Sequence, residues 1–359
     1  MKRPESDNAS LNRAPSASAG HAPDARGPAG WTGLFLSSSR TLPWCVLVAG
    51  AVGGFIAPAW TATAAPYPFV IALALFGMPH GAADWTVAAR LSGRVGIGHQ
   101  LRGFVGYLLL MAVSLGVMIW QPGFAALLFL LLTVFHFGMA DSTAVGADDD
   151  GSVARWGLVL GRGQLLLAAA FASHPASAWA PFGEIAAALG SASSARSPWM
   201  PSLDEMQWWA RVGVGAGVLC ALFSAGARVR RGSVHAALMD LAEHGLVLAL
   251  ALLADPLFAV GCFFLGVHAF RHTRRLACTR VVIAPPAQSL LQRIVRVHVI
   301  SLPLMLPTAA CVVPLCWLLG GFTVNTIAVA SIAFYMITTL PHHLLGLRLP
   351  RTDLAPAIV

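Results

Sequence analysis

Charged residues are scarce in this sequence. Only 11% of the 359 residues are Asp, Glu, Lys or Arg, whereas 57% are hydrophobic. A soluble domain carries about 25% charged residues, so this composition excludes an ordinary water-soluble fold. Apolar runs long enough to cross a hydrocarbon layer of about 30 Å recur along the chain. The sequence therefore predicts an all-α polytopic membrane protein, a bundle of about ten transmembrane helices.

Paired cysteines are also missing. The six cysteines, at positions 45, 220, 262, 278, 311 and 316, show no CxxC spacing. All but Cys278 lie inside apolar runs, where cysteine behaves as a small hydrophobic residue. This pattern argues against both a disulfide framework and a zinc ribbon.

The first 40 residues differ from the rest of the chain, because they are rich in Ser, Ala, Pro and Gly and lack apolar periodicity. They have no short apolar stretch followed by a cleavage site, as a signal peptide would. We expect residues 1–40 to form a disordered N-terminal tail, since such a composition cannot bury a core. Residues 41–348 are then a transmembrane catalytic domain, and residues 349–359 a short C-terminal tail.

The apolar segments give the expected order of spanning helices. Their ranges are 42–60, 66–85, 103–120, 123–140, 156–173, 207–226, 234–253, 256–272, 297–319 and 322–345. The long connection 174–206 is expected to include an amphipathic piece around Glu184 to Leu189. The GVGAG run at 213–217 is typical of close packing between membrane helices.

Basic residues indicate the orientation. With the N-terminal tail in the cytoplasm, twenty Lys and Arg residues fall on the cytoplasmic side and only Arg196 and Arg211 on the other. This asymmetry follows the positive-inside rule and predicts a multi-pass protein of the cell inner membrane with both termini cytoplasmic. It also accounts for the net charge of +8, so no nucleic-acid partner is needed to explain that charge.

Four histidines lie near the ends of three predicted spans: His80 in FGMPHGAADW, His136 in VFHFGMAD, and His268 and His272 in GVHAFRHTRR. The expected topology places these four, together with His342 in TLPHHLLG, at the cytoplasmic rim. A histidine inside a membrane helix is costly and typically functional. His268 and His272, four residues apart, share one helix face. The pattern favours a metal site made by these four histidines, because imidazoles suit iron, zinc or copper.

Acidic side chains follow two of these histidines. Asp84 comes four residues after His80, and Asp141 comes five after His136. Metal-bound imidazoles usually donate their second N–H to a carboxylate or carbonyl, so we expect Asp84 and Asp141 to accept those hydrogen bonds. Glu243 in the seventh span and His342 in the tenth are expected to contact the metal ligands without binding the ion themselves.

Other residues near the motifs have less specific roles. Trp85, Phe135, Phe137 and Phe264 are by default packing residues, but their proximity to the histidines makes them candidate walls for a long apolar substrate. A lone histidine at a membrane edge is more often interfacial than a ligand. We therefore interpret His298, which lies close to a basic loop, as an interfacial residue.

Four motifs together resemble the Brp/Blh family of membrane β-carotene 15,15′-dioxygenases. They are GMPHGAAD at 77–84, FHFGMAD at 135–141, HAFRH at 268–272 and PH at 341–342, in the family order. The resemblance extends over about residues 45 to 346. Trp85 stands where the family often has a further histidine, and Val267 and Ala269 also depart from its pattern. These departures leave the substrate preference open.

The resemblance implies an iron(II) centre held by His80, His136, His268 and His272, with O₂ as co-substrate. It implies scission of the central 15,15′ double bond of β-carotene, or of a related carotenoid taken from the bilayer, into two all-trans-retinal molecules. A functional link to a microbial rhodopsin follows from that product. An all-imidazole site leaves positions for O₂, and the protein's task is to position the central bond and exclude water.

Two other functions remain open at this stage. A di-iron desaturase or hydroxylase would need about eight histidines in HxxxH and HxxHH boxes, whereas this chain has one HxxxH and one HH doublet. A metal-ion or proton transporter would place polar groups through the depth of the bilayer. The histidines here gather at one rim, which favours a fixed site.

Overall fold

The computed structural model describes residues 39–91, 93, 96–147, 151–190, 201–279 and 289–349. The elements in these ranges are helices. In chain order they are α2 (Thr41–Ile56), α3 (Pro58–Thr63), α4 (Pro66–Ala72), the π-helix η1 (Leu73–Gly77), α5 (Met78–Ala82), α6 (Asp84–Leu91), α7 (Ile97–Trp120), α8 (Pro122–Ala144), α9 (Ser152–Ser173), α10 (Pro175–Ala188), α11 (Leu203–Arg230), α12 (Val234–Leu253), α13 (Pro256–Phe263), the π-helix η3 (Phe264–Ala269), α14 (Phe270–Cys278), α15 (Leu290–Leu318) and α16 (Val324–Gly346).

Eight helical stretches are long and apolar enough to cross a membrane. They are Pro66–Leu91, Gly98–Trp120, Pro122–Ala144, Ser152–Ser173, Leu203–Arg230, Val234–Leu253, Leu290–Leu318 and Val324–Gly346. The all-helical membrane architecture is confirmed, but the described residues give eight such stretches instead of about ten. The helix α2 is short, with 16 residues. The stretch from α13 to α14 ends in the polar sequence FRHTRRLAC.

The expected tails fall largely outside the described residues. Of residues 1–40 the structure describes Ser39 and Arg40, and of residues 349–359 it describes Leu349. Arg40 forms ion pairs with Asp240 and Glu243 of α12, so it belongs with the bundle. Within the expected connection 174–206, α10 is a regular helix that contains Glu184.

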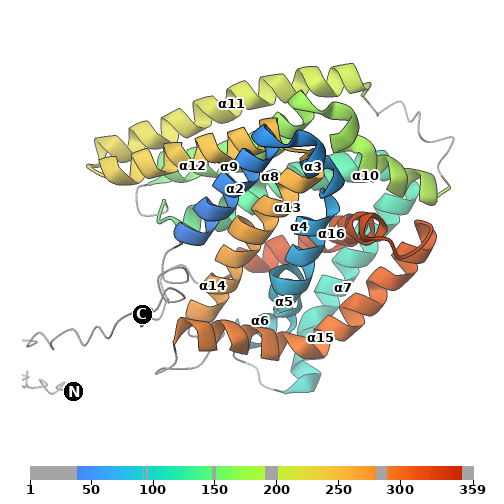
Figure 1. Ribbon diagram of the computed structural model, residues 1–359. Coiled ribbons are helices and arrows are strands. Elements are labelled where there is room, and N and C mark those ends of the chain that lie inside the picture. The colour runs from blue at the N-terminus through green and yellow to red at the C-terminus, as the bar shows by residue number, and fades with distance from the viewer. Residues whose placement is uncertain are drawn as a thin grey trace, which may run out of the picture.

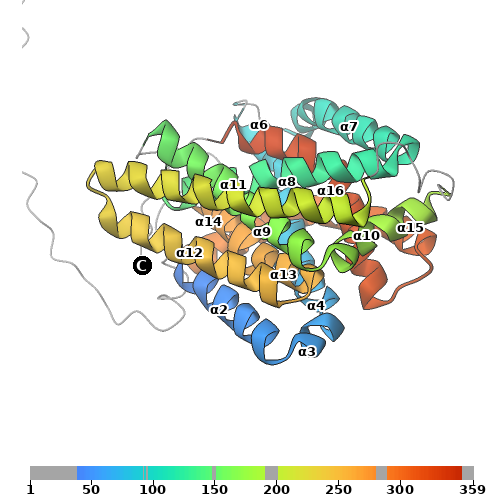
Figure 2. The same ribbon diagram turned by 90° about the horizontal axis from the view of Figure 1, so that it is seen from above.

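The helices pack in two groups, and α8 and α13 each contact helices of both groups. In the first, α9 lies against α8, α11 and α12, and α11 runs beside α12 along one edge of the molecule (Figure 1). In the second, α16 packs against α4, α7, α8 and α15. Seen from above, α2 and α3 lie at one side of the bundle and α6 and α7 at the other (Figure 2).

Glycines bring α8 and α9 into close contact. A Cβ atom on Gly138 of α8 would overlap the Val159 carbonyl of α9, and a Cβ atom on Gly163 of α9 would overlap the Val134 carbonyl of α8. The two backbones can therefore approach only because both positions lack a side chain. Gly217, from the run predicted to allow close packing, also lies against α9.

Large apolar side chains cover the outer faces. Leu306 is 78% exposed, and Trp120 and Trp317, both near helix ends, are each 73% exposed. Such exposed residues are unfavourable in water but favourable in contact with lipid, and tryptophan is enriched at the membrane interface. The outer surface therefore agrees with a protein surrounded by membrane.

Candidate metal centre

Five histidines from distant parts of the chain come together. His80 lies on α5, His136 on α8, His268 in η3, His272 on α14 and His342 on α16. None of the five is more than 8% exposed. The structure thus brings together the four histidines expected as ligands and adds His342 to them.

The spacing of the rings suits a shared ion. A metal–nitrogen bond to histidine is about 2.0–2.1 Å long. The centres of two imidazole rings that bind the same ion are therefore roughly 4.5–6.4 Å apart. The observed ring-centre distances are His136–His268 4.6 Å, His80–His272 5.0 Å, His80–His342 5.1 Å, His136–His342 5.1 Å, His272–His342 5.2 Å, His80–His268 5.8 Å and His268–His272 6.3 Å.

The ligand atoms do not converge on one point as the rings now stand. Within the described ranges, no group of three or more His, Cys, Asp or Glu side chains is arranged to hold a metal ion. Binding would require the rings to rotate about their side-chain bonds. Because the backbone already places the ring centres at suitable distances, no helix needs to move far.

Several ring nitrogens in the cluster are buried without a hydrogen-bond partner among the described residues. These are Nδ1 and Nε2 of His268 and Nε2 of His342. A buried polar atom without a partner costs about 1–3 kcal/mol, so native proteins rarely keep one without a reason. An imidazole lone pair that faces other imidazoles is a natural metal ligand, and the donor set therefore fits a bound cation.

Asp84 and His342 form one unit. The Nδ1 atom of His342 donates to Oδ2 of Asp84 across 2.6 Å, and the Tyr107 hydroxyl also hydrogen-bonds Asp84. Asp84 was expected to accept from His80, but Nδ1 of His80 instead donates to the Phe76 carbonyl at 2.7 Å. The physical reason is packing between helices, because α6 lies against α16 and brings Asp84 to His342.

The other two acids, Asp141 and Glu243, contact arginines and not histidines. Arg162 of α9 lies 3.1 Å from Asp141 and 2.9 Å from Glu243. Arg271 of α14 lies 3.1 Å from Asp141 and 2.7 Å from Glu243. All four side chains are 0% exposed. Since a buried carboxylate requires a compensating cation, these residues form a closed ion cluster beside the histidines.

The same ion cluster extends to a second pair of arginines. Arg40 pairs with Glu243 and Asp240, and Arg228 of α11 pairs with Asp240 at 2.6 Å. The Trp44 indole of α2 also donates to Glu243. The seven charged residues join α8, α9, α11, α12 and α14 to the start of α2. The sequence offered two signals for this cluster: an arginine at position 162 inside an apolar segment, and the acidic residues Asp240 and Glu243 inside the seventh predicted span.

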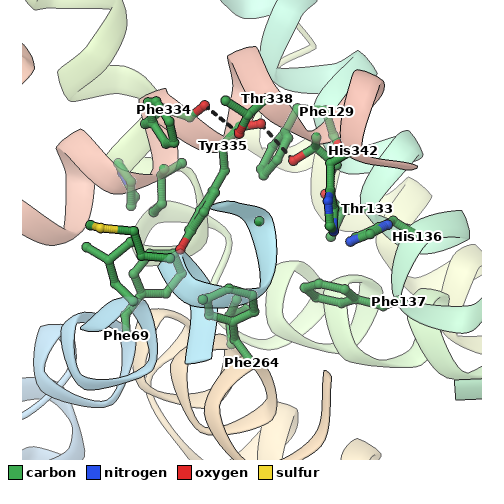
Figure 3. A pocket seen from close by; sticks show the side chains of 18 of the residues that line it. Phe69, Phe129, Thr133, His136, Phe137, Phe264, Phe334, Tyr335, Thr338 and His342 are labelled. Atoms are coloured by element: carbon green, nitrogen blue, oxygen red, sulfur yellow. Dashed lines mark hydrogen bonds between the residues drawn. The ribbon is translucent and has the colours of Figure 1, made fainter. Parts of the chain in front are cut away.

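An apolar cavity of about 280 Å³ leads away from the histidines. His80, His136 and His342 line one part of it, and Phe137 and Phe264 lie beside them (Figure 3). Its volume is close to the lower end of the roughly 300–1,000 Å³ range of small-molecule pockets. Of the four aromatic residues expected as walls, Phe137 and Phe264 line the cavity.

The remaining two expected wall residues lie elsewhere. Trp85 packs on Phe104, with ring centres 5.5 Å apart. Phe135 is two positions before Phe137 on α8, so its side chain points to another side of the helix. Neither belongs to the cavity lining that the described residues provide.

Tyr335 lines the cavity but was not predicted from the sequence. Its hydroxyl is buried without a partner among the described residues and points between Phe69 and Phe264 (Figure 3). The Tyr335 and Phe264 rings pack edge to face, with centres 5.3 Å apart. A tyrosine in an apolar membrane segment was the available signal.

Comparison with known proteins agrees with this geometry. The family described as beta-carotene 15,15'-dioxygenase matches residues 71–349, which include all five histidines. The chain is 28% identical over 332 residues to the probable beta-carotene 15,15'-dioxygenase Blh of Halobacterium salinarum, covering 88% of this chain and 95% of that protein. It is 37% identical over 76 residues to the beta-carotene 15,15'-dioxygenase of uncultured marine bacterium 66A03, covering 21% and 28%. No solved structure matches the chain. The chain belongs to the beta-carotene 15,15′-dioxygenase family of membrane enzymes.

Proposed function

We propose that the protein is a non-haem iron dioxygenase that cleaves the central 15,15′ double bond of β-carotene with O₂ and releases two all-trans-retinal molecules. The observation that carries this proposal is the meeting of five buried histidines, three of which line an apolar cavity. Family membership supports the reaction class. The bilayer supplies the substrate, and the product is the chromophore of microbial rhodopsins, which suggests a functional link to such a protein.

The proposed ligands are His80, His136, His268 and His272, and bound Fe(II) would supply the activation of O₂. His342 presents its Nε2 to the same space, because its Nδ1–H is committed to Asp84. This hydrogen bond fixes the orientation and the tautomer of the His342 ring. The role of Asp84 is thus to orient an imidazole, as expected, although the imidazole is that of His342.

The chain's other residues would position the substrate. Phe137 and Phe264 offer flat aromatic faces beside the histidines, and a conjugated polyene can stack on them. The apolar lining excludes water from the reacting carbons. Leu108 of α7 and Cys311 of α15 also line the cavity and are exposed on the outer surface. A carotenoid dissolved in lipid could therefore enter from the side.

We further propose that α2 and the stretch from α13 to α14 complete about ten membrane segments. The excess of arginine in the connections favours an orientation with both termini in the cytoplasm of the cell inner membrane. In this arrangement the histidines lie near the cytoplasmic side. Reporter fusions to each terminus, compared with fusions to the 174–206 connection, would test the orientation.

The test of function is expression in a carotene-producing bacterial host, followed by pigment chromatography. We expect loss of β-carotene and appearance of retinal, and we expect His→Ala changes at 80, 136, 268 and 272 each to abolish retinal. His235→Ala, at an exposed position at the start of α12, is the matched control.

One iron per purified chain agrees with the proposal, and two would favour a di-iron enzyme. Metal uptake by vesicles without retinal formation would overturn it in favour of a transporter.

A further inference from the structure

The helix that carries His80 is interrupted just before that residue. The π-helix η1 ends at Gly77, and Pro79 follows within α5. In a continuous α-helix the N–H of residue 79 would pair with the Leu75 carbonyl, four residues earlier. Proline has no N–H, and its ring pushes against that carbonyl. The sequence LFGMPH therefore opens the helix backbone one turn before a proposed metal ligand.

A neighbouring helix supplies donors to this interrupted segment. Both ring nitrogens of His298 in α15 lie against backbone carbonyls: Nε2 is 2.6 Å from that of Leu75, and Nδ1 is 2.9 Å from that of Ile294 in its own helix. The tautomer with the proton on Nε2 donates to Leu75. Ser301, three residues later on the same face of α15, shares its single hydroxyl proton between the Pro79 carbonyl at 2.6 Å and the Val297 carbonyl of its own helix at 2.7 Å. The two contacts lie one turn apart along both helices. His298, interpreted from the sequence as an interfacial residue, thus contacts the backbone of another helix.

The position of the His80 ring depends directly on this backbone. Its Nδ1 donates to the Phe76 carbonyl at 2.7 Å, and Phe76 lies between the two carbonyls that α15 holds. The Phe76 ring also packs against the His298 ring, with centres 6.1 Å apart. A shift of residues 75–79 would therefore carry the imidazole of His80 with it. Metal ligation tolerates only about 0.2 Å of error in bond length.

We propose that His298 and Ser301 are positioning residues, which set the place of His80 by holding the carbonyls of Leu75 and Pro79 in the interrupted segment. This inference rests on the proposed function, in which His80 is an iron ligand. Neither residue touches the reacting atoms, because neither lines the described cavity. Their removal should weaken metal binding and slow the chemical step, and substrate binding should change little.

The test compares donor-lacking with donor-retaining variants of the full-length purified chain. His298→Leu removes the donor, and His298→Gln keeps an amide N–H of similar reach. Ser301→Ala removes one oxygen only. The matched control is Ser331→Ala, because Ser331 is equally buried but donates only within its own helix, to the Ile327 carbonyl. Fe(II) affinity is measured by titration of the metal-free chain, and kcat and KM are measured with β-carotene.

We expect His298→Leu and Ser301→Ala each to raise the Fe(II) dissociation constant about tenfold, the lower end of the effect of losing a group that orients a ligand. The kcat should fall, and KM for β-carotene should stay within about twofold, since the cavity is unchanged. His298→Gln should recover most of the Fe(II) affinity. Ser331→Ala should match the wild type in all three quantities.

The outcomes separate this inference from the proposed function. Iron retained at wild-type affinity by His80→Ala would remove His80 from the ligands and overturn both. Loss of iron in His80→Ala, with wild-type affinity and kcat in Ser301→Ala and His298→Leu, would overturn this inference alone. If His298→Leu fails to fold, Ser301→Ala decides, because the loss of one oxygen leaves the packing intact. A lower yield with normal iron affinity in the folded fraction would also overturn it.

Discussion

The imidazole of His342 and the carboxylate of Asp84 lie 2.6 Å apart, although 258 residues separate them in sequence. This contact joins α16 to the start of α6 and leaves the second nitrogen of His342 facing three other imidazoles. A carboxylate–histidine pair of this kind fixes both the orientation and the tautomer of a ligand. It places the His342 ring among the clustered histidines.

Replacement of this carboxylate is expected to lower activity without disturbing the fold. Asp84→Asn keeps the shape of the side chain but offers a neutral amide to His342, so retinal formation and iron affinity should each fall about 10–100-fold. Tyr107→Phe, which removes one hydrogen bond to Asp84 and leaves its charge, should have a smaller effect. Equal activity of Asp84→Asn and the wild type would show that the pair plays no part in the reaction.

Loss of one arginine from the ion cluster is expected to destabilise the protein strongly. Arg271→Met leaves Asp141 and Glu243 buried with fewer cations, and breaking such a pair costs about 3–5 kcal/mol. Thermal unfolding in detergent should show a clear drop in melting temperature. Arg230→Met, at an exposed position near the end of α11, is the control and should change little. A stable Arg271→Met protein would contradict the importance of the cluster.

Filling the far part of the cavity is expected to block the substrate and spare the metal. Ala178 of α10 is buried and lines the cavity, whereas Ala176 on the same helix is exposed and does not. Ala178→Trp should therefore lower kcat/KM for β-carotene at least tenfold with normal iron content, and Ala176→Trp should leave both unchanged. Full activity of Ala178→Trp would mean that the carotenoid lies elsewhere.

A methyl group at the α8–α9 contact should be tolerated far less than one on an open helix face. Gly138→Ala puts a Cβ atom into the Val159 carbonyl, and α8, which carries His136, must move away. We expect a lower melting temperature together with lower iron affinity. Gly106→Ala on α7 meets nothing within 4 Å and should be neutral or stabilising by about 0.5–1 kcal/mol. The same melting temperature for both variants would contradict this account of the contact.

Removal of iron should abolish activity reversibly. Chelation of Fe(II) from the purified protein is expected to stop retinal formation, and added Fe(II) should restore it. Zinc can occupy imidazole sites but has no redox chemistry, so it should bind without restoring activity. The measurement is retinal yield against metal content for each addition. Activity that survives complete removal of iron would contradict the proposed cofactor.

The sequence was sufficient to predict that the fold is helical and membrane-bound and that His80, His136, His268 and His272 meet. Apolar length and histidine position carry this information along one helix at a time. Contacts between helices were harder to predict. Asp141 stands five residues after His136 and was assigned to that histidine, but the partner it finds is set by how α8 packs on α9 and α14.

Local breaks in the helices were the second source of error. The predicted span 66–85 is present within one helical stretch, Pro66–Leu91, but this stretch changes from α-helix to π-helix and back before His80. Each change rotates the residues that follow, so spacing along an ideal helix no longer gives their direction. The irregular segment also leaves the Leu75 carbonyl next to the ring of His298, a contact that apolar length and spacing do not predict.

The ion cluster also has a consequence for biogenesis. As the chain emerges from the ribosome, Arg162 enters the membrane soon after Asp141, its first available counter-ion, and 81 residues before Glu243. Arg271 arrives last and connects to both acids. Because an unneutralised arginine is costly in lipid, Arg162 depends on Asp141 alone until Glu243 is inserted, and the cluster is complete only once α14 is inserted. A chain truncated before that helix would hold only part of the cluster, and cellular quality control would be expected to degrade it.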